Sequence, residues 1–226
     1  MPPLRATQPG IHFQTDTLHA CPVVHIVDDD RSSRLATARL LRAAGHTVRT
    51  YGSATEFLSA SPSRTPGCVV LDLQLPGANG LEVQQALAQA DDPLPVIFLS
   101  GRGDVPQSVQ AMKAGAVDFL TKADGADLLL NAVSQALARD AADRRKREHR
   151  TELRARYERL SAREREVFAH LISGQLNKQV GFDLGISLQT TKIHRHRVFE
   201  KMQADSVVQL ARMAVDLGVD PVGKIR

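Results

Sequence analysis

Strand-like apolar runs alternate with helix-like stretches five times after Pro22, and this alternation constrains the fold more than any other feature of the sequence. The apolar runs are short and lack strict polar alternation, as expected for strands that helices cover on both faces. We expect strands near residues 22–27, 47–50, 67–71, 95–99 and 117–120. We expect helices near residues 31–44, 53–60, 79–89 and 105–114, and from about residue 126 onward. The pattern predicts an α/β unit of the (βα)5 type around a parallel sheet.

Polar or charged residues follow four of these predicted strands. Asp28 and Asp29 come after the first strand, Asp72 after the third, Ser100 ends the fourth, and Lys122 follows the fifth. Because the carboxyl ends of parallel strands meet at one edge of the sheet, where such sheets bind ligands, we expect these side chains to converge in one crevice.

The chemistry of this set points to a divalent cation and a phosphoryl group. Three carboxylates so close together repel one another unless a cation offsets their charge. Mg²⁺ prefers oxygen ligands and commonly takes one or two carboxylates together with water and phosphate. One carboxylate is then a nucleophile toward a phosphoryl donor, with Lys122 and Ser100 stabilising the phosphoryl oxygens. Asp30 is predicted instead to be the N-cap of the helix that begins at Arg31.

Charge divides the chain into two parts. Residues 1–140 hold 11 Lys and Arg against 14 Asp and Glu, a net charge of −3, whereas residues 141–226 hold 18 against 11, a net charge of +7. The stretch from Asp127 to Leu160 lacks Gly and Pro and is rich in charge, which predicts one long helix that leaves the first domain as a linker. The basic second part suggests a polyanionic partner, although a solvated helix face also explains the basic linker.

The part after the linker has an all-helical pattern. Ser161-Ala162-Arg163-Glu164 is a capping box before an apolar helix. Three further helices are expected, the first two with N-caps at Asn177 and Ser187 and the third from about Ser206. The middle two, joined by a tight turn through Gly185, fit a helix-turn-helix whose second helix enters the major groove.

A helical wheel of that second helix separates a packing side from an outward side. The side expected to pack inward carries Thr191, His194, Val198 and Met202. The outward set, which we expect to read base edges, is Lys192, Ile193 and His196, flanked by Gln189, Thr190 and Arg197. The cations expected to contact phosphates are Lys178, Arg195 and Lys201. A basic helical surface that is merely solvated is the competing interpretation.

Several observations bear on location. The first twenty residues have no continuous apolar stretch of the kind found in a secretory signal, and no run approaches the roughly 18 apolar residues of a membrane span. If Asp28 and Asp72 lie level on neighbouring strands, Cys21 and Cys68 are offset by about 10 Å, which is beyond disulfide reach. We expect a cytoplasmic protein with buried, reduced thiols and no membrane contact.

Residues 22–125 resemble the receiver domain of two-component response regulators. The resemblance rests on VVHIVDDD, VVLDLQLPGANGLEV and VIFLSGRGDVPQSVQAMKAGAVDFLTK. It implies a flavodoxin-like fold with Asp72 as the phosphoacceptor, and Mg²⁺ held by Asp28, Asp29, Asp72 and the main-chain carbonyl of Gln74. It also implies that Ser100 is a switch hydroxyl, that Lys122 pairs with the phosphate, and that Phe119 is the aromatic whose rotation follows Ser100. Phe119 equally suits a plain core position.

One residue departs from the receiver pattern. Receivers usually have proline after the lysine, often joined by a cis peptide bond, and here Ala123 follows Lys122. A cis bond to a residue other than proline costs about 2.5–4 kcal/mol, so we expect the Lys122–Ala123 bond to be trans.

Residues 160–214 resemble the LuxR-type DNA-binding domain, through LSAREREVFAHLISGQLNKQVGFDLGISLQTTKIHRHRVFEKM. Members of that family read bases from the positions that Lys192, Ile193 and His196 hold here, which agrees with the wheel. Two positions depart from the family: Gly181 stands where alanine is usual, and Thr191 where valine is usual. Glycine in place of alanine inside a helix costs about 1 kcal/mol, so we expect this domain to be less stable alone.

Together the two resemblances match the NarL/FixJ response regulators, and the GDVPQSVQAMKAGAVDF run points to the FixJ-like subgroup. The implied domains are an N-terminal tail (1–21), a receiver (22–140), a helical linker (141–159) and the DNA-binding domain (160–226). We expect a transcription regulator rather than an enzyme, phosphorylated by a sensor histidine kinase. Its implied partners are double-stranded promoter DNA, a second copy of the chain upon phosphorylation, and RNA polymerase.

Alternatives remain at this stage. Phosphorylation can act by dimerisation or by unmasking a DNA-binding domain held against the receiver. A haloacid-dehalogenase-type phosphatase needs an acidic residue where Gln74 stands. The strand-end aspartates argue against an autoinducer-sensing LuxR protein. A receiver that only takes up phosphate would not need residues 160–214.

Overall fold

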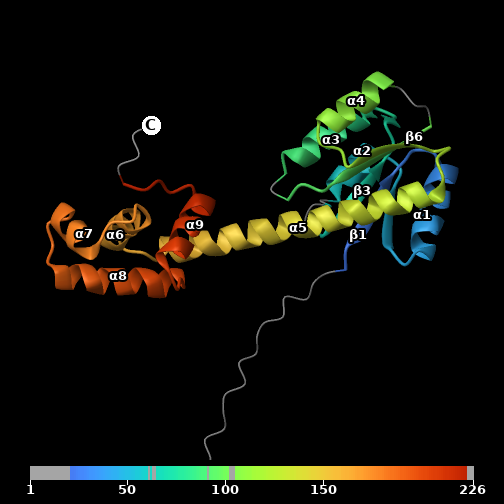
Figure 1. Cartoon of the computed structure of the whole chain (residues 1–226). Coiled ribbons are helices and arrows are strands. Elements are labelled where there is room, and N and C mark those ends of the chain that lie inside the picture. The colour runs from blue at the N-terminus through green and yellow to red at the C-terminus, as the bar shows by residue number, and fades with distance from the viewer. Residues whose placement is uncertain (1–20, 61, 63–64, 91, 102–104, 223–226) are drawn as a thin grey trace, which may run out of the picture. The chain divides into compact units, whose positions relative to one another are not determined.

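The computed structural model describes residues 21–60, 62, 65–90, 92–101 and 105–222 (Figure 1). The predicted N-terminal tail lies outside the described residues except for Cys21. The chain divides into two compact units between Ala141 and Ala142.

A five-stranded parallel sheet forms the centre of the first unit. Its strands are β1 (Val23–Val27), β2 (Thr47–Tyr51), β3 (Gly67–Leu71), β6 (Val96–Ser100) and β7 (Asp118–Thr121). Their order in the sheet is β2-β1-β3-β6-β7. The second strand is at the edge of the sheet and the first strand lies between the second and the third, as in flavodoxin-like folds. The predicted (βα)5 architecture is therefore confirmed.

Helices cover both faces of the sheet and bury two apolar cores. They are α1 (Arg31–Ala43), α2 (Ala54–Ser59), α3 (Gly80–Ala88), α4 (Val105–Lys113) and α5 (Ala126–Glu158). One core joins the sheet to α2, α3 and α4, and includes the fully buried Phe57 and Phe98. The other joins it to α1 and the first part of α5, through residues such as Leu41 and Val133. The three central strands β1, β3 and β6 are buried along their whole length, which explains why they are mostly apolar, whereas the edge strands β2 and β7 are partly exposed and carry polar residues.

A short hairpin that the sequence did not predict follows Asp72. Its strands β4 (Gln74–Leu75) and β5 (Ala78–Asn79) pair in antiparallel fashion around a turn in which Gly77 has a φ of 77°. The hairpin leads into α3 at Gly80, where a Cβ would lie 2.6 Å from the carbonyl oxygen of Asp72. Glycine at this position therefore lets α3 begin directly beside the end of β3.

The long helix α5 continues beyond the boundary between the units, as predicted. Its last turns belong to the core of the second unit, because Leu153 is only 1% exposed there and Tyr157 packs against the same cluster. The ring of Tyr157 meets that of Phe168 edge-on, with centroids 5.4 Å apart. The second hydrophobic core thus begins within the segment predicted to be linker.

The second unit is all-helical. After the end of α5 it contains α6 (Ala162–Ile172), α7 (Asn177–Asp183), α8 (Leu188–Met202) and α9 (Val207–Leu217). The capping box at Ser161 and Glu164 and the cap at Ser187 are confirmed, and α9 begins after Ser206, which caps it. The predicted cap at Asn177 is wrong by one residue: Leu176 occupies the N-cap position, and Asn177 opens the helix.

The two cysteines are free. In the register of β1 and β3, Val24 pairs with Cys68. Cys21 precedes Val24 by three residues, so the two cysteines are offset along the strands by three residues, as expected. Cys68 is buried, and burial raises the pKa of its thiol to about 12, with a smaller contribution from Asp140. The expectation that both thiols are buried is wrong for Cys21, which is exposed.

Candidate functional site

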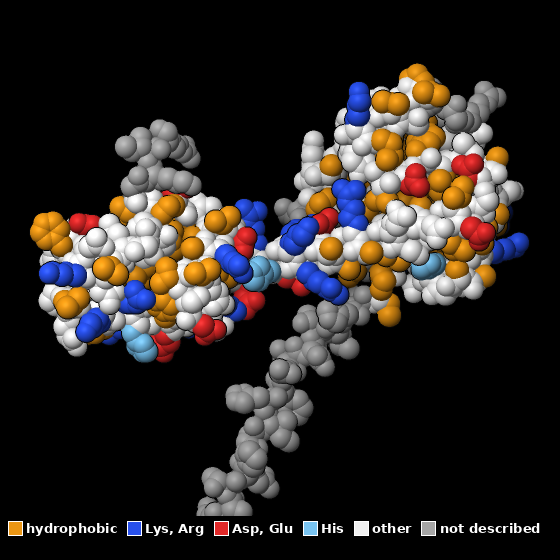
Figure 2. All heavy atoms as spheres, in the orientation of Figure 1, with side chains coloured by type: hydrophobic (Ala, Val, Ile, Leu, Met, Phe, Trp, Pro, Cys, Tyr) orange, Lys and Arg blue, Asp and Glu red, His pale blue; other side chains and the backbone are white. Residues whose placement is uncertain are grey.

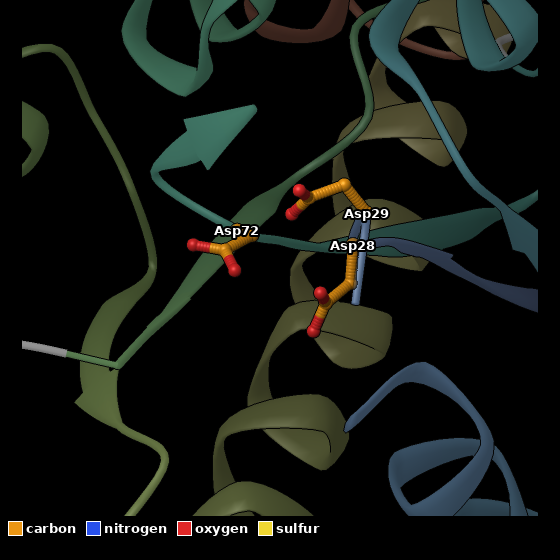
Figure 3. Close-up of side chains that lie close together, drawn as sticks. All are labelled: Asp28, Asp29 and Asp72. Atoms are coloured by element: carbon orange, nitrogen blue, oxygen red, sulfur yellow. The ribbon is translucent and has the colours of Figure 1, made fainter. Parts of the chain in front are cut away.

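Three aspartates meet at the carboxyl edge of the sheet (Figure 3). Strands β1 and β3 are neighbours, and their register pairs Val27 with Leu71, so the residues that follow, Asp28 and Asp72, lie level. Carboxylate oxygens of Asp28, Asp29 and Asp72 lie within 4.8 Å of one another. Asp28 and Asp72 are 3% and 8% exposed, whereas Asp29 is open to solvent.

Lys122 binds two of these carboxylates at once. Its Nζ atom lies 2.7 Å from Oδ2 of Asp28 and 2.6 Å from Oδ2 of Asp72. The lysine follows β7, and its backbone amide donates a 2.8 Å hydrogen bond to the carbonyl of Ser100 on β6, which fixes the start of its side chain. Burial lowers the pKa of Lys122, but the hydrogen bonds that it donates to both carboxylates, together with their negative charges, outweigh this effect, so the pKa lies above its ordinary value. The lysine is therefore a cation that partly neutralises the acidic cluster.

The loop between β1 and α1 holds Asp28 from several sides. The Ser33 hydroxyl donates to Oδ2 of Asp28 at 2.7 Å, and the backbone amide of Asp30 donates to Oδ1 at 2.9 Å. Arg34 donates to the carbonyl oxygens of Asp28 and Asp29. Asp30 itself caps α1 by accepting from the amide of Ser32, as predicted. Sequence reasoning missed Ser33 and Arg34, although both lie one helical turn beyond the aspartates.

The remaining predicted receiver residues surround this cluster. Ser100 is 3% exposed at the end of β6. Phe119 is half-buried, with its ring tilted against that of Phe98 at 6.0 Å between centroids. The amide of Gln74 donates to Oδ1 of Asp72 at 3.1 Å. The Lys122–Ala123 peptide bond is trans, as predicted.

The donor set fits a hard divalent cation. Two nearly buried carboxylates and one exposed carboxylate face one another, and a single lysine supplies too little positive charge to balance them. Oxygen donors of this kind are what Mg²⁺ takes from proteins. Asp28, Asp29, Asp72 and the Gln74 carbonyl are the residues that would hold it.

The helix predicted to enter the DNA groove corresponds to α8. Its inward side is buried as the wheel predicted, with Thr191, Val198 and Met202 all at 0% exposure, whereas His194 is only half-buried. Its outward side exposes the set predicted to read bases, Lys192, Ile193 and His196, together with Gln189 and Arg197. Thr190 is half-buried, and its hydroxyl lies 2.8 Å from that of Ser187. Figure 2 shows Lys, Arg and His side chains along the edge of this unit where α8 runs.

The three cations assigned to phosphates have different surroundings. Lys178 is exposed at the start of α7. Arg195 donates to Oδ1 of Asn177 at 3.1 Å and lies over the ring of Phe199. Lys201 contacts the nearly buried Glu164 at 2.6 Å and the carbonyl of Arg159 at 3.1 Å. Lys201 is thus engaged inside its own domain, which the sequence did not reveal.

The two departures from the LuxR pattern, Gly181 and Thr191, touch each other. A Cβ at Gly181 would lie 2.9 Å from Oγ1 of Thr191 and 3.0 Å from the carbonyl of Ile186. The Thr191 hydroxyl, which donates to the carbonyl of Ser187 at 3.0 Å, occupies the space that an alanine methyl would need. The glycine is therefore a packing partner of the threonine at the contact between α7 and α8.

Comparison with known proteins agrees with these two sites. Residues 24–134 match the response regulator receiver domain, and residues 158–214 match the bacterial regulatory proteins of the luxR family. The chain belongs to the response regulators that join a receiver domain to a LuxR-type DNA-binding domain, with relatives that include FixJ proteins.

Individual relatives span most of the chain. The response regulator protein TmoT of Ectopseudomonas mendocina is 41% identical over 84% of this chain and 87% of its own length. The transcriptional regulatory protein FixJ of Azorhizobium caulinodans is 41% identical over 88% of this chain and 94% of its own length. The solved structure of the response regulator StyR is similar with a TM-score of 0.78, at 39% identity, and covers 87% of this chain and 99% of its own.

Among the described residues, no helix combines the length and the apolar character needed to cross a membrane.

Proposed function

We propose that this response regulator is phosphorylated on Asp72 by a sensor histidine kinase in the cytoplasm, and that phosphorylation activates it to bind promoter DNA and stimulate transcription. The observation that supports this most strongly is the arrangement of Lys122 between Asp28 and Asp72, beside a third carboxylate. The receiver at residues 22–140 carries the phosphoacceptor. The domain at residues 160–226, extended by Leu153 of the linker 141–159, carries the DNA-binding surface.

In the proposed reaction an oxygen of Asp72 attacks the phosphorus of the donor, and the bond from phosphorus to the donor atom breaks. Lys122 already donates to Oδ2 of Asp72, so it is placed to donate to a phosphoryl oxygen that forms there. The Ser100 hydroxyl, at the end of the adjacent strand, would donate to another. Bound Mg²⁺ would supply positive charge to the phosphoryl oxygens, with Asp28, Asp29 and the Gln74 carbonyl as its further ligands.

Activation would then pass from Ser100 to Phe119 and to the face made by α4 and β7. Phe119 is half-buried beside Phe98, and its side chain would rotate when Ser100 moves. On α4, the residues Val105, Val109 and Met112 are 72%, 46% and 45% exposed, and their spacing places them on one side of the helix. This exposed apolar stripe supports dimerisation through α4 and β7.

Dimerisation would join two recognition helices on one DNA site. Two weak half-site contacts become one strong contact through effective concentration. Lys192, Ile193 and His196 would contact base edges, flanked by Gln189, Thr190 and Arg197, while Lys178 and Arg195 contact phosphates. RNA polymerase is the proposed partner of the DNA-bound dimer. Lys201 is the least suited of the predicted contacts, because its Nζ is already bound to Glu164.

Incubation with Mg²⁺ and acetyl phosphate tests the first step. We expect intact mass spectrometry to show one added phosphoryl group, stable in acid and labile in base. Asp72→Asn protein is expected to gain none, and Asp127→Asn protein, changed at an exposed position of the same unit, is a matched control that retains it. Absence of any incorporation in the parent protein would contradict the proposal.

Sedimentation of the same samples tests the second step. We expect the phosphorylated chain, but not the Asp72→Asn chain, to shift toward a dimer. Dimerisation that does not change with phosphorylation would favour release of a masked DNA-binding domain instead.

A further inference from the structure

A cavity of about 430 Å³ opens between α1, β7 and the beginning of α5. This volume lies within the range of small-molecule sites, which is roughly 300–1,000 Å³. The cavity belongs entirely to the receiver unit, on the face of the sheet that α1 and α5 cover. Of the residues that line it, only Lys122 takes part in the reaction proposed above.

The walls of the cavity are mainly apolar. Four leucines contribute to them, one from each surrounding element: Leu40 on α1, Leu99 on β6, Leu120 on β7 and Leu129 on α5. Three of the four are less than 9% exposed, so their positions are fixed by the core behind them. Such a surface favours the apolar body of a ligand.

Polar residues at one end connect the cavity to the acidic cluster. Ser33 and Lys122 line the cavity. Each also donates to Oδ2 of Asp28, and Lys122 donates to Asp72 as well. An occupant that hydrogen-bonds Ser33 or Lys122 would therefore touch the residues that hold the phosphoacceptor.

The charges at this end disfavour an anionic occupant. The single positive charge of Lys122 is shared between Asp28 and Asp72. The carboxylate of Asp124 also lines the cavity, where it accepts from the amide of Thr121. Negative charge thus exceeds positive charge near the polar end.

We propose that this cavity is a binding site for an uncharged amphipathic small molecule, with its apolar body against the four leucines and its hydroxyl at Ser33 and Lys122. Because such a ligand contacts groups that bind the phosphoacceptor, its binding and the state of Asp72 affect each other reciprocally. The binding itself does not depend on the proposed phosphorylation, and it is measured without a phosphodonor.

Titration with 2-naphthol tests the site directly. The chain contains no tryptophan, so the fluorescence of the naphthol ring can be excited apart from that of the protein. For a probe of about 11 heavy atoms we expect saturable binding with a dissociation constant on the order of 0.1 mM. Ala36→Phe places a ring in the cavity from an exposed position on α1 and is expected to weaken binding at least about tenfold.

The matched control is Leu35→Phe, which adds a ring to the neighbouring exposed position outside the cavity lining. It is expected to leave the affinity unchanged within about twofold, and thermal unfolding of both variants checks that they fold. The anion 2-naphthoate is expected to bind about tenfold more weakly than 2-naphthol. Lack of saturable binding, equal loss in both variants, or equal affinity for the anion would overturn the proposal.

Discussion

Two lysine–carboxylate clusters, one in each unit, look alike locally but differ in their balance of charge. In the second unit Lys201 pairs with one nearly buried carboxylate, Glu164, at 2.6 Å. In the receiver Lys122 makes contacts of the same length with Asp28 and Asp72, and Asp29 adds a third carboxylate close by. The second-unit pair is balanced, whereas the receiver cluster has an excess of negative charge.

This difference separates a structural ion pair from a reactive one. The Glu164–Lys201 pair joins the start of α6 to the end of α8, and Glu164 also accepts from the Ser161 amide in the capping box. All of its interactions are internal to the fold. The receiver cluster is incomplete without a further cation, so it is the one suited to binding a metal and a phosphoryl group.

Removal of Lys122 is expected to have the largest effect. Lys122→Ala removes a donor aimed at Asp72, so we expect phosphorylation by acetyl phosphate to slow by about 100-fold. The variant also leaves Asp28 and Asp72 facing each other unpaired, so added Mg²⁺ should raise its melting temperature more than that of the parent. Lys113→Ala, at an exposed position, is the control. A phosphorylation rate close to that of the parent would contradict a reactive role for Lys122.

Removal of Lys201 is expected to affect stability rather than reactivity. Lys201→Ala leaves Glu164 buried without its counter-ion, and we expect the unfolding free energy of the second unit to fall by about 3 kcal/mol. Exposed Lys192→Ala should leave stability unchanged and weaken DNA binding about tenfold. Urea unfolding and fluorescence anisotropy with DNA measure the two effects. If Lys201→Ala lost only DNA affinity, the predicted phosphate contact would be correct and the structural role wrong.

Unlike the two lysine–carboxylate clusters, the buried His25 has no counter-ion among the contacts described. It is 0% exposed on β1, and its Nδ1 lies 3.0 Å from the Tyr51 hydroxyl. Burial, with a smaller contribution from the charge of Arg49, lowers the pKa of His25 from 6.5 to about 4. Between about pH 4 and pH 6.5, His25 therefore takes up a proton in the unfolded chain but stays neutral in the folded chain. The neutral histidine contributes its full stability above pH 6.5, and about 3 kcal/mol is lost as the pH falls toward 4.

Urea unfolding of the receiver unit between pH 7 and pH 4 measures this loss. We expect His25→Leu to show a shallower decline than the parent. Parallel curves for His25→Leu and the parent would show that His25 does not titrate in this range.

The contact between Gly181 and Thr191 is expected to give the smallest effect. Gly181→Ala should destabilise the second unit, because the new methyl meets the Thr191 hydroxyl. The cost should be about 1 kcal/mol smaller when Thr191→Ala is already present. A double-mutant cycle by urea unfolding measures this coupling, and additive effects would mean that the two departures from the family pattern are independent.

The receiver site could be predicted from the sequence because its residues follow directly from strand ends. Asp28 and Asp72 stand immediately after apolar runs and Lys122 stands directly after β7, and the parallel sheet brings such positions together whatever the details of packing. The starts of α1, α6 and α8 were also predictable from their caps, whereas the start of α7 was misplaced by one residue at Asn177.

Features that depend on contacts between distant side chains could not be predicted in this way. The Ser33 hydroxyl reaches the Asp28 carboxylate only because of the way in which α1 packs against the loop before it. The sequence predicted that Lys201 contacts DNA phosphates, because a helical wheel shows which side of α8 a residue occupies. The wheel does not show that Lys201 forms an ion pair with Glu164 on α6. The Gly181–Thr191 contact likewise joins two helices, so each residue looked like an isolated departure.

DNA affinity as a function of phosphorylation tests the central proposal most directly. A DNA site can be selected from a random library with the acetyl-phosphate-treated protein, and its affinity then measured by fluorescence anisotropy at one fixed salt concentration. We predict at least about tenfold tighter binding for the phosphorylated parent than for the untreated parent, and no change for Asp72→Asn treated in the same way. Equal affinity of treated and untreated parent protein, with phosphate shown to be present on Asp72, would contradict the account.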